Sequence, residues 1–207
     1  MSDISEYDYS KTTELVKSYL PSGYKGNVFR LSYSWQIIIP ITNEPIKIME
    51  IGTYHGANIC SYMKTYTHHN ETQIHSVYPY IDYNGYNEYM SKQPSNYSIF
   101  LNNISKLDPI DLNNIYIHCG LSEDIVPLFP NDSFDIICID GNHDKKYALE
   151  DAVLCFKKLK LDGWMNFDDM LFKEDSDAVH VFLTIYSPFF EIFKIDNAQL
   201  FIKRKTE

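Results

Sequence analysis

The sequence predicts an α/β fold in which a doubly wound, seven-stranded and mostly parallel sheet ends in a C-terminal antiparallel hairpin. Short apolar runs alternate along the chain with helical patterns, which is typical of βαβ units. The runs are almost continuously apolar, as in strands that helices cover on both faces. The last two runs, FEIFKI and QLFIKR, flank Asp196-Asn197 and predict the hairpin.

Five strands are expected before that hairpin, each a short run of apolar and β-branched residues. They cover residues 46–51, 73–78, 115–119, 134–139 and 163–167. Helical patterns lie between them, at 57–67, 84–104, 144–160 and 175–187.

The helix expected at 144–160 has the clearest pattern of the four. Its apolar stripe repeats at helical spacing and consists of Leu149, Ala152, Val153, Phe156 and Leu159. Asp144 can cap its first turn, and Asp162-Gly163 is expected to end it.

The chain of 207 residues fits one domain, with residues 1–45 as an N-terminal helical cap on a core at 46–207. Within the cap, residues 10–20 have the pattern of a capped helix, and the apolar residues 34–40 are expected to pack on the sheet.

Composition excludes several classes of function. The formal net charge of -10 argues against a nucleic-acid partner, because such binding depends on Lys and Arg that neutralise phosphates. The four cysteines lack CxxC spacing, which argues against disulfides and zinc. No signal peptide or spanning segment is evident, so we expect a cytoplasmic protein without a membrane partner. A homo-oligomer is left open.

A glycine turn follows the first strand, in IMEIGTYHGAN. Glu50 stands at the strand end, and Gly52 and Gly56 precede the helix. Such a turn lets a ligand approach the backbone at a helix N-terminus. The spacing is G-x-x-x-G, with Tyr54 where a dinucleotide site would have its second glycine. By itself the pattern fits an ordinary strand-to-helix turn equally well.

Carboxylates follow two strands that a single helix separates. Asp140 comes after strand 134–139, and Asp168-Asp169 come after strand 163–167. One crossover helix makes these strands parallel neighbours, so the acids share the carboxyl edge of the sheet, where open α/β sheets bind ligands. Three carboxylates there repel one another unless a cation joins them, and oxygen ligands favour Mg²⁺.

His143 stands three residues after Asp140, at the start of the next helix. The helix dipole disfavours imidazolium there, so we expect a neutral ring that can accept a proton near pH 7. With the three aspartates it would perform metal-assisted proton abstraction from a hydroxyl, whose oxygen then attacks an electrophilic carbon. The alternative is structural: Asp144 caps the helix, Asp168-Asp169 form a polar loop and His143 is merely exposed.

The long block FDIICIDGNHDKKYALEDAVLCFKKLKLDGWMNFDDM resembles a class I S-adenosylmethionine-dependent methyltransferase family that includes metal-dependent sugar O-methyltransferases. The segments EIGTYHGAN and YPYIDYNGYNEY match its earlier blocks, so the resemblance covers roughly residues 33–170. It implies a Rossmann-like fold and methyl transfer to a hydroxyl of a small molecule, with a sugar as the candidate acceptor and Mg²⁺ assistance.

The resemblance also implies roles for individual residues. It makes His143 the catalytic base and gives Asp140, Asp168 and Asp169 as metal ligands. It places S-adenosylmethionine against Glu50, Gly52, Thr53, Tyr54, Gly56, Tyr78, Ser122 and Asp140, with Ser122 near the adenine.

Tyr78 departs from the family pattern. The family usually has an acid at the end of the second strand, where it binds the ribose hydroxyls. A phenol makes fewer hydrogen bonds than a carboxylate, although Asp82 is close enough in sequence to substitute. An alternative is therefore a binding or structural protein that has the fold but has lost the cofactor. A nicotinamide-dependent oxidoreductase is disfavoured by the missing GxGxxG.

Overall fold

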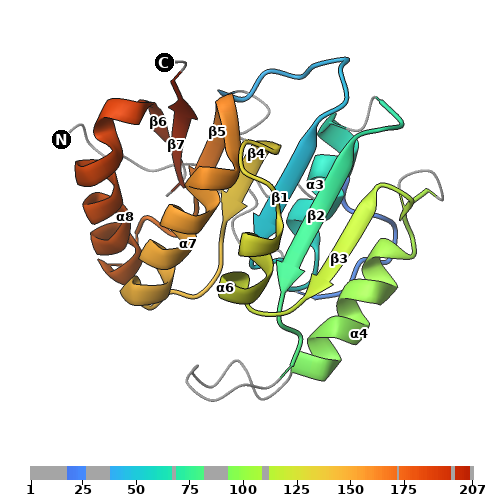
Figure 1. Cartoon of the computed structure of the whole chain (residues 1–207). Coiled ribbons are helices and arrows are strands. Elements are labelled where there is room, and N and C mark those ends of the chain that lie inside the picture. Colours follow the sequence, from blue (N-terminus) through green and yellow to red (C-terminus); the bar gives the residue numbers. More distant parts are fainter. Residues whose placement is uncertain are drawn as a thin grey trace.

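Seven strands form one sheet in the order β3-β2-β1-β4-β5-β7-β6 (Figure 1). Strands β1 to β5 pair in parallel, whereas β7 runs antiparallel to both β5 and β6. This arrangement confirms the predicted doubly wound sheet and its C-terminal hairpin. The chain first builds outward from β1 to β3 and then returns to place β4 on the other side of β1. Ligand sites of open α/β sheets lie at such a reversal.

The strand bounds agree closely with the prediction up to β4. They are β1 Lys47–Ile51, β2 Gln73–Tyr78, β3 Ile115–Cys119, β4 Phe134–Ile139, β5 Leu159–Phe167, β6 Phe190–Asp196 and β7 Gln199–Arg204. This is a computed structural model, and it describes residues 18–26, 38–66, 69–81, 93–108, 112–171, 173–196 and 199–205.

Strand β5 begins four residues earlier than predicted, and the prediction that Asp162-Gly163 ends the preceding helix is wrong. Leu159 already has extended backbone and pairs with Phe134 of β4. The register between β4 and β5 then shifts, and Asp162 takes a left-handed φ of 61°. Asp162-Gly163 therefore lies in an irregular part of the strand and does not end a helix.

The helices are α3 Ala57–Tyr66, α4 Gln93–Ile104, α6 Ser122–Ile125, α7 Lys145–Lys158 and α8 Lys173–Tyr186, with 3-10 turns η2 Val126–Leu128 and η3 Ser187–Phe189. The predicted cap of α7 is confirmed, because the Asp144 carboxylate accepts a hydrogen bond from the Lys146 backbone N–H at 2.9 Å. Residues 84–92 of a predicted helix lie outside the described residues, as do residues 10–17 and 34–37 of the predicted cap.

Helices cover both faces of the sheet. Figure 1 shows α3 behind the strands and α7 in front of them. One core cluster joins Ile48 to Tyr62 of α3 and Phe100 of α4, and the other joins Met49 to α7 and α8. Neighbouring residues of β1 thus face opposite cores, which explains why its sequence is almost continuously apolar.

Two further expectations can be compared with the structure. All four cysteines are free, and Cys60, Cys138 and Cys155 are buried. Within the part of the chain that the structure describes, no helix has the length and apolar character needed to cross a bilayer.

Candidate functional site

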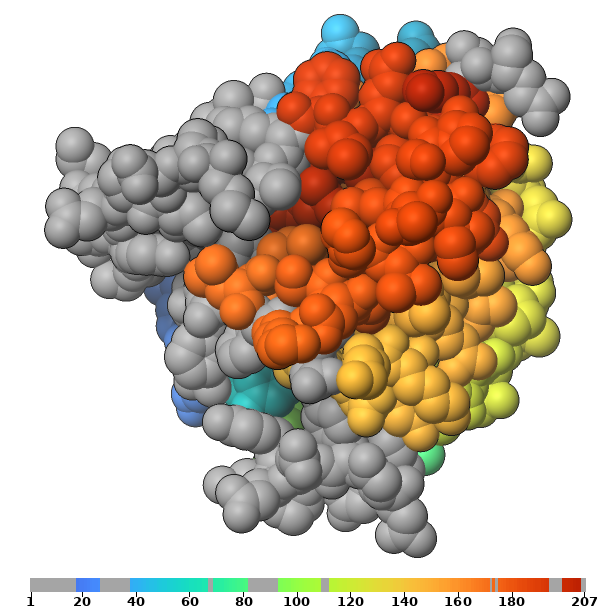
Figure 2. All heavy atoms as spheres, turned by 90° about the vertical axis from the view of Figure 1, so that its left-hand side faces the viewer, coloured from blue at the N-terminus to red at the C-terminus, as the bar shows by residue number. Residues whose placement is uncertain are grey.

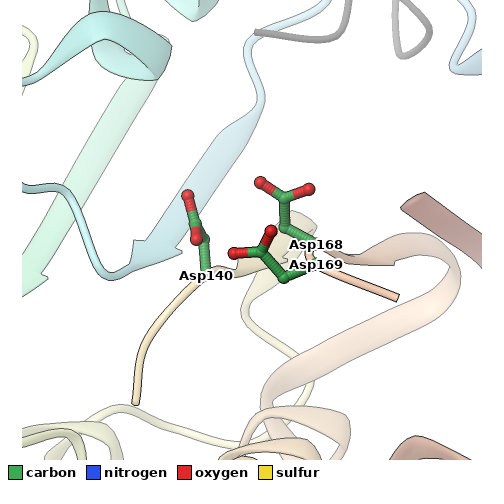
Figure 3. A group of neighbouring side chains, drawn as sticks. All are labelled: Asp140, Asp168 and Asp169. Carbon is green, nitrogen blue, oxygen red and sulfur yellow. The ribbon is translucent and has the colours of Figure 1, made fainter. Parts of the chain in front are cut away.

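Three aspartates converge where β4 and β5 end. The ladder continues one residue past each strand, since Asp140 N donates to Ile51 O at 2.8 Å and Asp168 N donates to Ile139 O at 3.0 Å. Each of Asp140, Asp168 and Asp169 offers a carboxylate oxygen, and these oxygens lie within 4.8 Å of one another. Figure 3 shows the three side chains gathered around one space. The sequence prediction that these acids share one edge is confirmed.

The negative charges of these three aspartates repel one another. Burial, followed by the charges of Asp168 and Asp169, raises the pKa of Asp140 well above its usual range. Gln199 of β7, which the sequence did not single out, donates a hydrogen bond from Nε2 to Asp168 Oδ1 at 3.1 Å. Asp169 has a left-handed φ of 55°, an uncommon conformation that functional sites often retain. An all-oxygen set under mutual repulsion fits a hard cation such as Mg²⁺.

His143 lies between this cluster and helix α8. Its Nε2 is 3.6 Å from Asp169 Oδ2, and its Nδ1 is 3.3 Å from Asp175 Oδ2. Interaction with Asp175 is the main cause that raises the pKa of His143, against the lowering effect of burial. The nearby carboxylates thus act against the helix dipole, and the expectation of a neutral ring stays a prediction.

The glycine turn packs closely against the backbone of Asp140, one of the three candidate metal ligands. Gly52 has a φ of +98°, and a Cβ on it would lie 1.5 Å from the carbonyl oxygen of Asp140. Gly56 has a φ of +82°, and a Cβ there would lie 2.7 Å from the Phe100 ring. Both positions exclude a side chain, by backbone conformation and by contact. The turn expected to hold a cofactor thus adjoins the backbone of Asp140.

Glu50 is a fully buried acid beneath this turn. It is 0 % exposed, and no hydrogen bond of normal geometry from the described residues reaches either carboxylate oxygen. Burial raises its pKa to about 7, even though nearby Asn58 and Thr53 favour the ionised form. A cationic ligand would offset the cost of ionising this buried carboxyl group. The ammonium group of S-adenosylmethionine fits this requirement.

Aromatic side chains line the turn on the side of β2. Tyr78, at the end of β2, has its ring 6.4 Å from that of Tyr54 and 4.5 Å from that of Tyr80. The Tyr80 hydroxyl donates to the Tyr54 carbonyl at 2.9 Å, which supports the left-handed φ of 46° at Tyr54. The position of the usual acid is thus occupied by a ring in an aromatic cluster, and Asp82 lies outside the described residues.

Ser122, predicted to lie near the adenine, is the first residue of α6, in the connection that follows β3. Burial raises the pKa of Asp151 on α7 to about 7, and the interaction of its carboxylate with the Ser122 hydroxyl partly counteracts this by favouring the ionised acid. Asp151 also lies close to the backbone of Gly141, where an added Cβ would be 3.0 Å from its Oδ2. Ser122 is therefore linked to the loop that carries Asp140.

The sequence did not indicate the hydrogen bonds that fix the backbone around His55. The Asn103 side chain on α4 donates to the carbonyl oxygens of His55 at 3.0 Å and Lys25 at 2.7 Å, and it accepts from the Lys25 N–H at 2.9 Å. The Tyr24 hydroxyl also donates to His55 O, at 3.3 Å. The segment around Lys25 and helix α4 therefore hold the glycine turn together. Only the contacts between distant segments reveal this.

Comparison with known protein families identifies the family of the chain. The family model described as "Methyltransferase domain" matches residues 49–170, more than half of the chain. These residues include the glycine turn, the three aspartates and His143. No curated protein sequence matches this chain.

Solved structures share the fold at low sequence identity. The O-methyltransferase NovP has a TM-score of 0.57 at 18% identity, over 79% of this chain and 74% of its own. Cofactor-bound Rv0187 from MTB has a TM-score of 0.61 at 12% identity, over 100% of this chain and 94% of its own. A protein from Corynebacterium glutamicum has a TM-score of 0.60 at 10% identity, over 100% of this chain and 93% of its own.

Proposed function

The chain belongs to the methyltransferase domain family, and from this premise we propose that it transfers a methyl group from S-adenosylmethionine to a hydroxyl of a small molecule, assisted by Mg²⁺. The observation that carries the proposal is the convergence of Asp140, Asp168, Asp169 and His143 beside the glycine turn. A sugar is the candidate acceptor, from the resemblance of the sequence to a family with sugar O-methyltransferases. The similarity to NovP supports transfer to oxygen.

The cofactor would bind along the turn after β1. S-adenosylmethionine supplies a methyl group on a positively charged sulfur. Glu50 would face its ammonium group, which supplies the positive charge that this buried carboxylate lacks. The backbone around Gly52 and Gly56 would approach the methionine and ribose. Residues Thr53, Tyr54, Tyr78, Ser122 and Asp140 would complete the site.

The aspartates would hold the cation and orient the acceptor. A bound Mg²⁺ lowers the pKa of a hydroxyl that it contacts. Its charge would also offset the negative charges of Asp168 and Asp169. The pKa of His143 would then be lower, so the ring would more readily be in the neutral form that a base requires.

His143 would act as the base through Nε2, the nitrogen on the side of Asp169. The acceptor O–H bond breaks as Nε2 takes the proton. The cofactor would supply the methyl group: the acceptor oxygen would bond to the methyl carbon, and the electron pair of the C–S bond would remain on sulfur. The protein would contribute alignment of these groups and a place for the proton.

Calorimetry with S-adenosylmethionine, with and without Mg²⁺, tests binding. Transfer of labelled methyl from the cofactor to a panel of sugars and other hydroxyl compounds tests activity. We expect Asp169→Asn to weaken the dependence on Mg²⁺, and His143→Ala to slow turnover with cofactor affinity nearly unchanged. Asp177→Asn, a half-exposed position on α8, is the control.

Absence of binding at millimolar cofactor would refute the proposal and favour a binding protein that has lost the cofactor. Tyr78 is the residue that would then explain the loss. Full activity of His143→Ala would show that the base is a different group.

A further inference from the structure

Asp175 is a buried carboxylate in an apolar stripe of α8. It shares this stripe with Ala178, Val179 and Phe182, and the four residues are 7%, 3%, 3% and 0% exposed. Phe182 packs edge-on against Phe156 of α7 at 5.5 Å between ring centroids. Figure 2 shows α8 on the outer surface of this side of the molecule, so the stripe faces inward beneath it. A helix with this pattern normally has an apolar residue at such a position.

A buried carboxylate lowers stability unless a partner offsets the loss of hydration. Its neighbour is the imidazole of His143, with Nδ1 at 3.3 Å from Asp175 Oδ2. This contact is longer than a well-aligned hydrogen bond. No hydrogen bond of normal geometry from the described residues reaches Asp175 Oδ2. The second ring nitrogen, Nε2, lies toward Asp169 at 3.6 Å. The imidazole of His143 therefore lies between the carboxylate of Asp175 on α8 and that of Asp169, a candidate metal ligand.

We propose that Asp175 is the positioning residue for His143, holding the neutral ring in the tautomer that carries its proton on Nδ1. The Nε2 lone pair is then directed toward the acceptor hydroxyl. This inference rests on the proposed function, in which Nε2 takes up the hydroxyl proton. After that transfer both ring nitrogens carry protons, and the Asp175 carboxylate faces the positive ring.

A role as a fourth metal ligand is the main alternative. The group of carboxylates whose oxygens lie within 4.8 Å of one another consists of Asp140, Asp168 and Asp169, without Asp175. Asp175 contacts Nδ1 of the imidazole, whereas Asp169 of this group lies nearer to Nε2. The geometry thus favours an action through His143.

The tautomer can be measured without any reaction. In protein labelled with ¹⁵N-histidine, two-dimensional spectra distinguish Nδ1–H from Nε2–H in neutral rings. The chain has 7 histidines, and a His143→Gln spectrum identifies the signals of His143 by difference. We expect Nδ1–H in the native protein and a shift toward Nε2–H in Asp175→Asn. Asp177→Asn on the same helix should leave the tautomer unchanged.

Kinetics give the second readout. We expect Asp175→Asn to lower kcat on the order of 10³-fold or more with little change in KM, because the corresponding change in a serine-protease triad costs about 10⁴-fold. Asp175→Glu should restore part of kcat. Both Asp175 variants should bind Mg²⁺ with the affinity of the native protein, whereas Asp168→Asn should weaken Mg²⁺ binding.

The outcomes separate the two proposals. A tautomer that is unchanged in Asp175→Asn, or a loss of Mg²⁺ affinity equal to that of Asp168→Asn, would overturn the role of Asp175. A shifted tautomer in a protein that methylates no hydroxyl compound would support the positioning of His143 and refute methyl transfer.

Discussion

Replacing Glu50 with glutamine should stabilise the cofactor-free protein at high pH and weaken cofactor binding. The substitution keeps the size of the side chain and removes its ability to ionise. In the native protein this carboxyl is buried, and no well-formed hydrogen bond from the described residues reaches its oxygens. Ionisation of this buried carboxyl group is unfavourable unless a cation is bound next to it.

The magnitude follows from the shift of the pKa from 4.5 to about 7, which corresponds to roughly 3 kcal/mol. Below pH 4.5 the group is protonated in both folded and unfolded chains and has no effect. As the pH rises to about 7, the unfolded chain ionises first, so the free energy of unfolding decreases. Above that pH the full penalty applies to the native protein, and Glu50→Gln avoids it.

Urea unfolding at a series of pH values from about 5 to about 8 measures this difference. Native protein and Glu50→Gln should differ little at the acidic end, and the variant should become more stable by up to roughly 3 kcal/mol at the alkaline end. Glu71→Gln, an exposed residue before β2, is the control and should follow the native curve.

Cofactor binding should change in the opposite direction. Loss of one partner of a buried charge pair costs about 2 kcal/mol or more, so the Kd of Glu50→Gln for S-adenosylmethionine should rise about thirtyfold or more at pH 8. Parallel pH curves for the native protein and the variant would refute the argument about Glu50. An unchanged Kd would show that the cofactor ammonium binds elsewhere.

Three further predictions concern the surroundings of the site. Gly52→Ala should abolish stable folding or lower the melting temperature sharply, because its Cβ would overlap the Asp140 carbonyl oxygen at 1.5 Å; a native melting curve would contradict this. Asn103→Ala should cost about 1–3 kcal/mol of unfolding free energy, from lost hydrogen bonds to buried backbone, whereas exposed Asn102→Ala should cost little. Tyr78→Asp should tighten S-adenosylmethionine binding about tenfold by restoring a carboxylate for the ribose, as calorimetry can measure; weaker binding would count against that role.

The sequence predicted the strands well where apolar runs are bounded by polar residues. Strands β2 and β4 match because both of their faces are buried, which makes each apolar run distinct, and the bounds of the less buried edge strand β3 match as well. The boundary between α7 and β5 could not be predicted in the same way. Leu159 continues the apolar stripe of the helix, and only its pairing with Phe134 shows that it belongs to the strand.

The sequence by itself determined that Asp140, Asp168 and Asp169 meet at one edge. Each follows a parallel strand and a single helix separates the strands, so chain connectivity and the right-handed crossover fix their common place. The tertiary structure alone decided the charge environment. It brings Asp175 to His143 and leaves the Glu50 oxygens without a well-formed hydrogen bond from the described residues. Ionisation depends on distances of a few ångströms between distant segments, and spacing along a chain does not specify them.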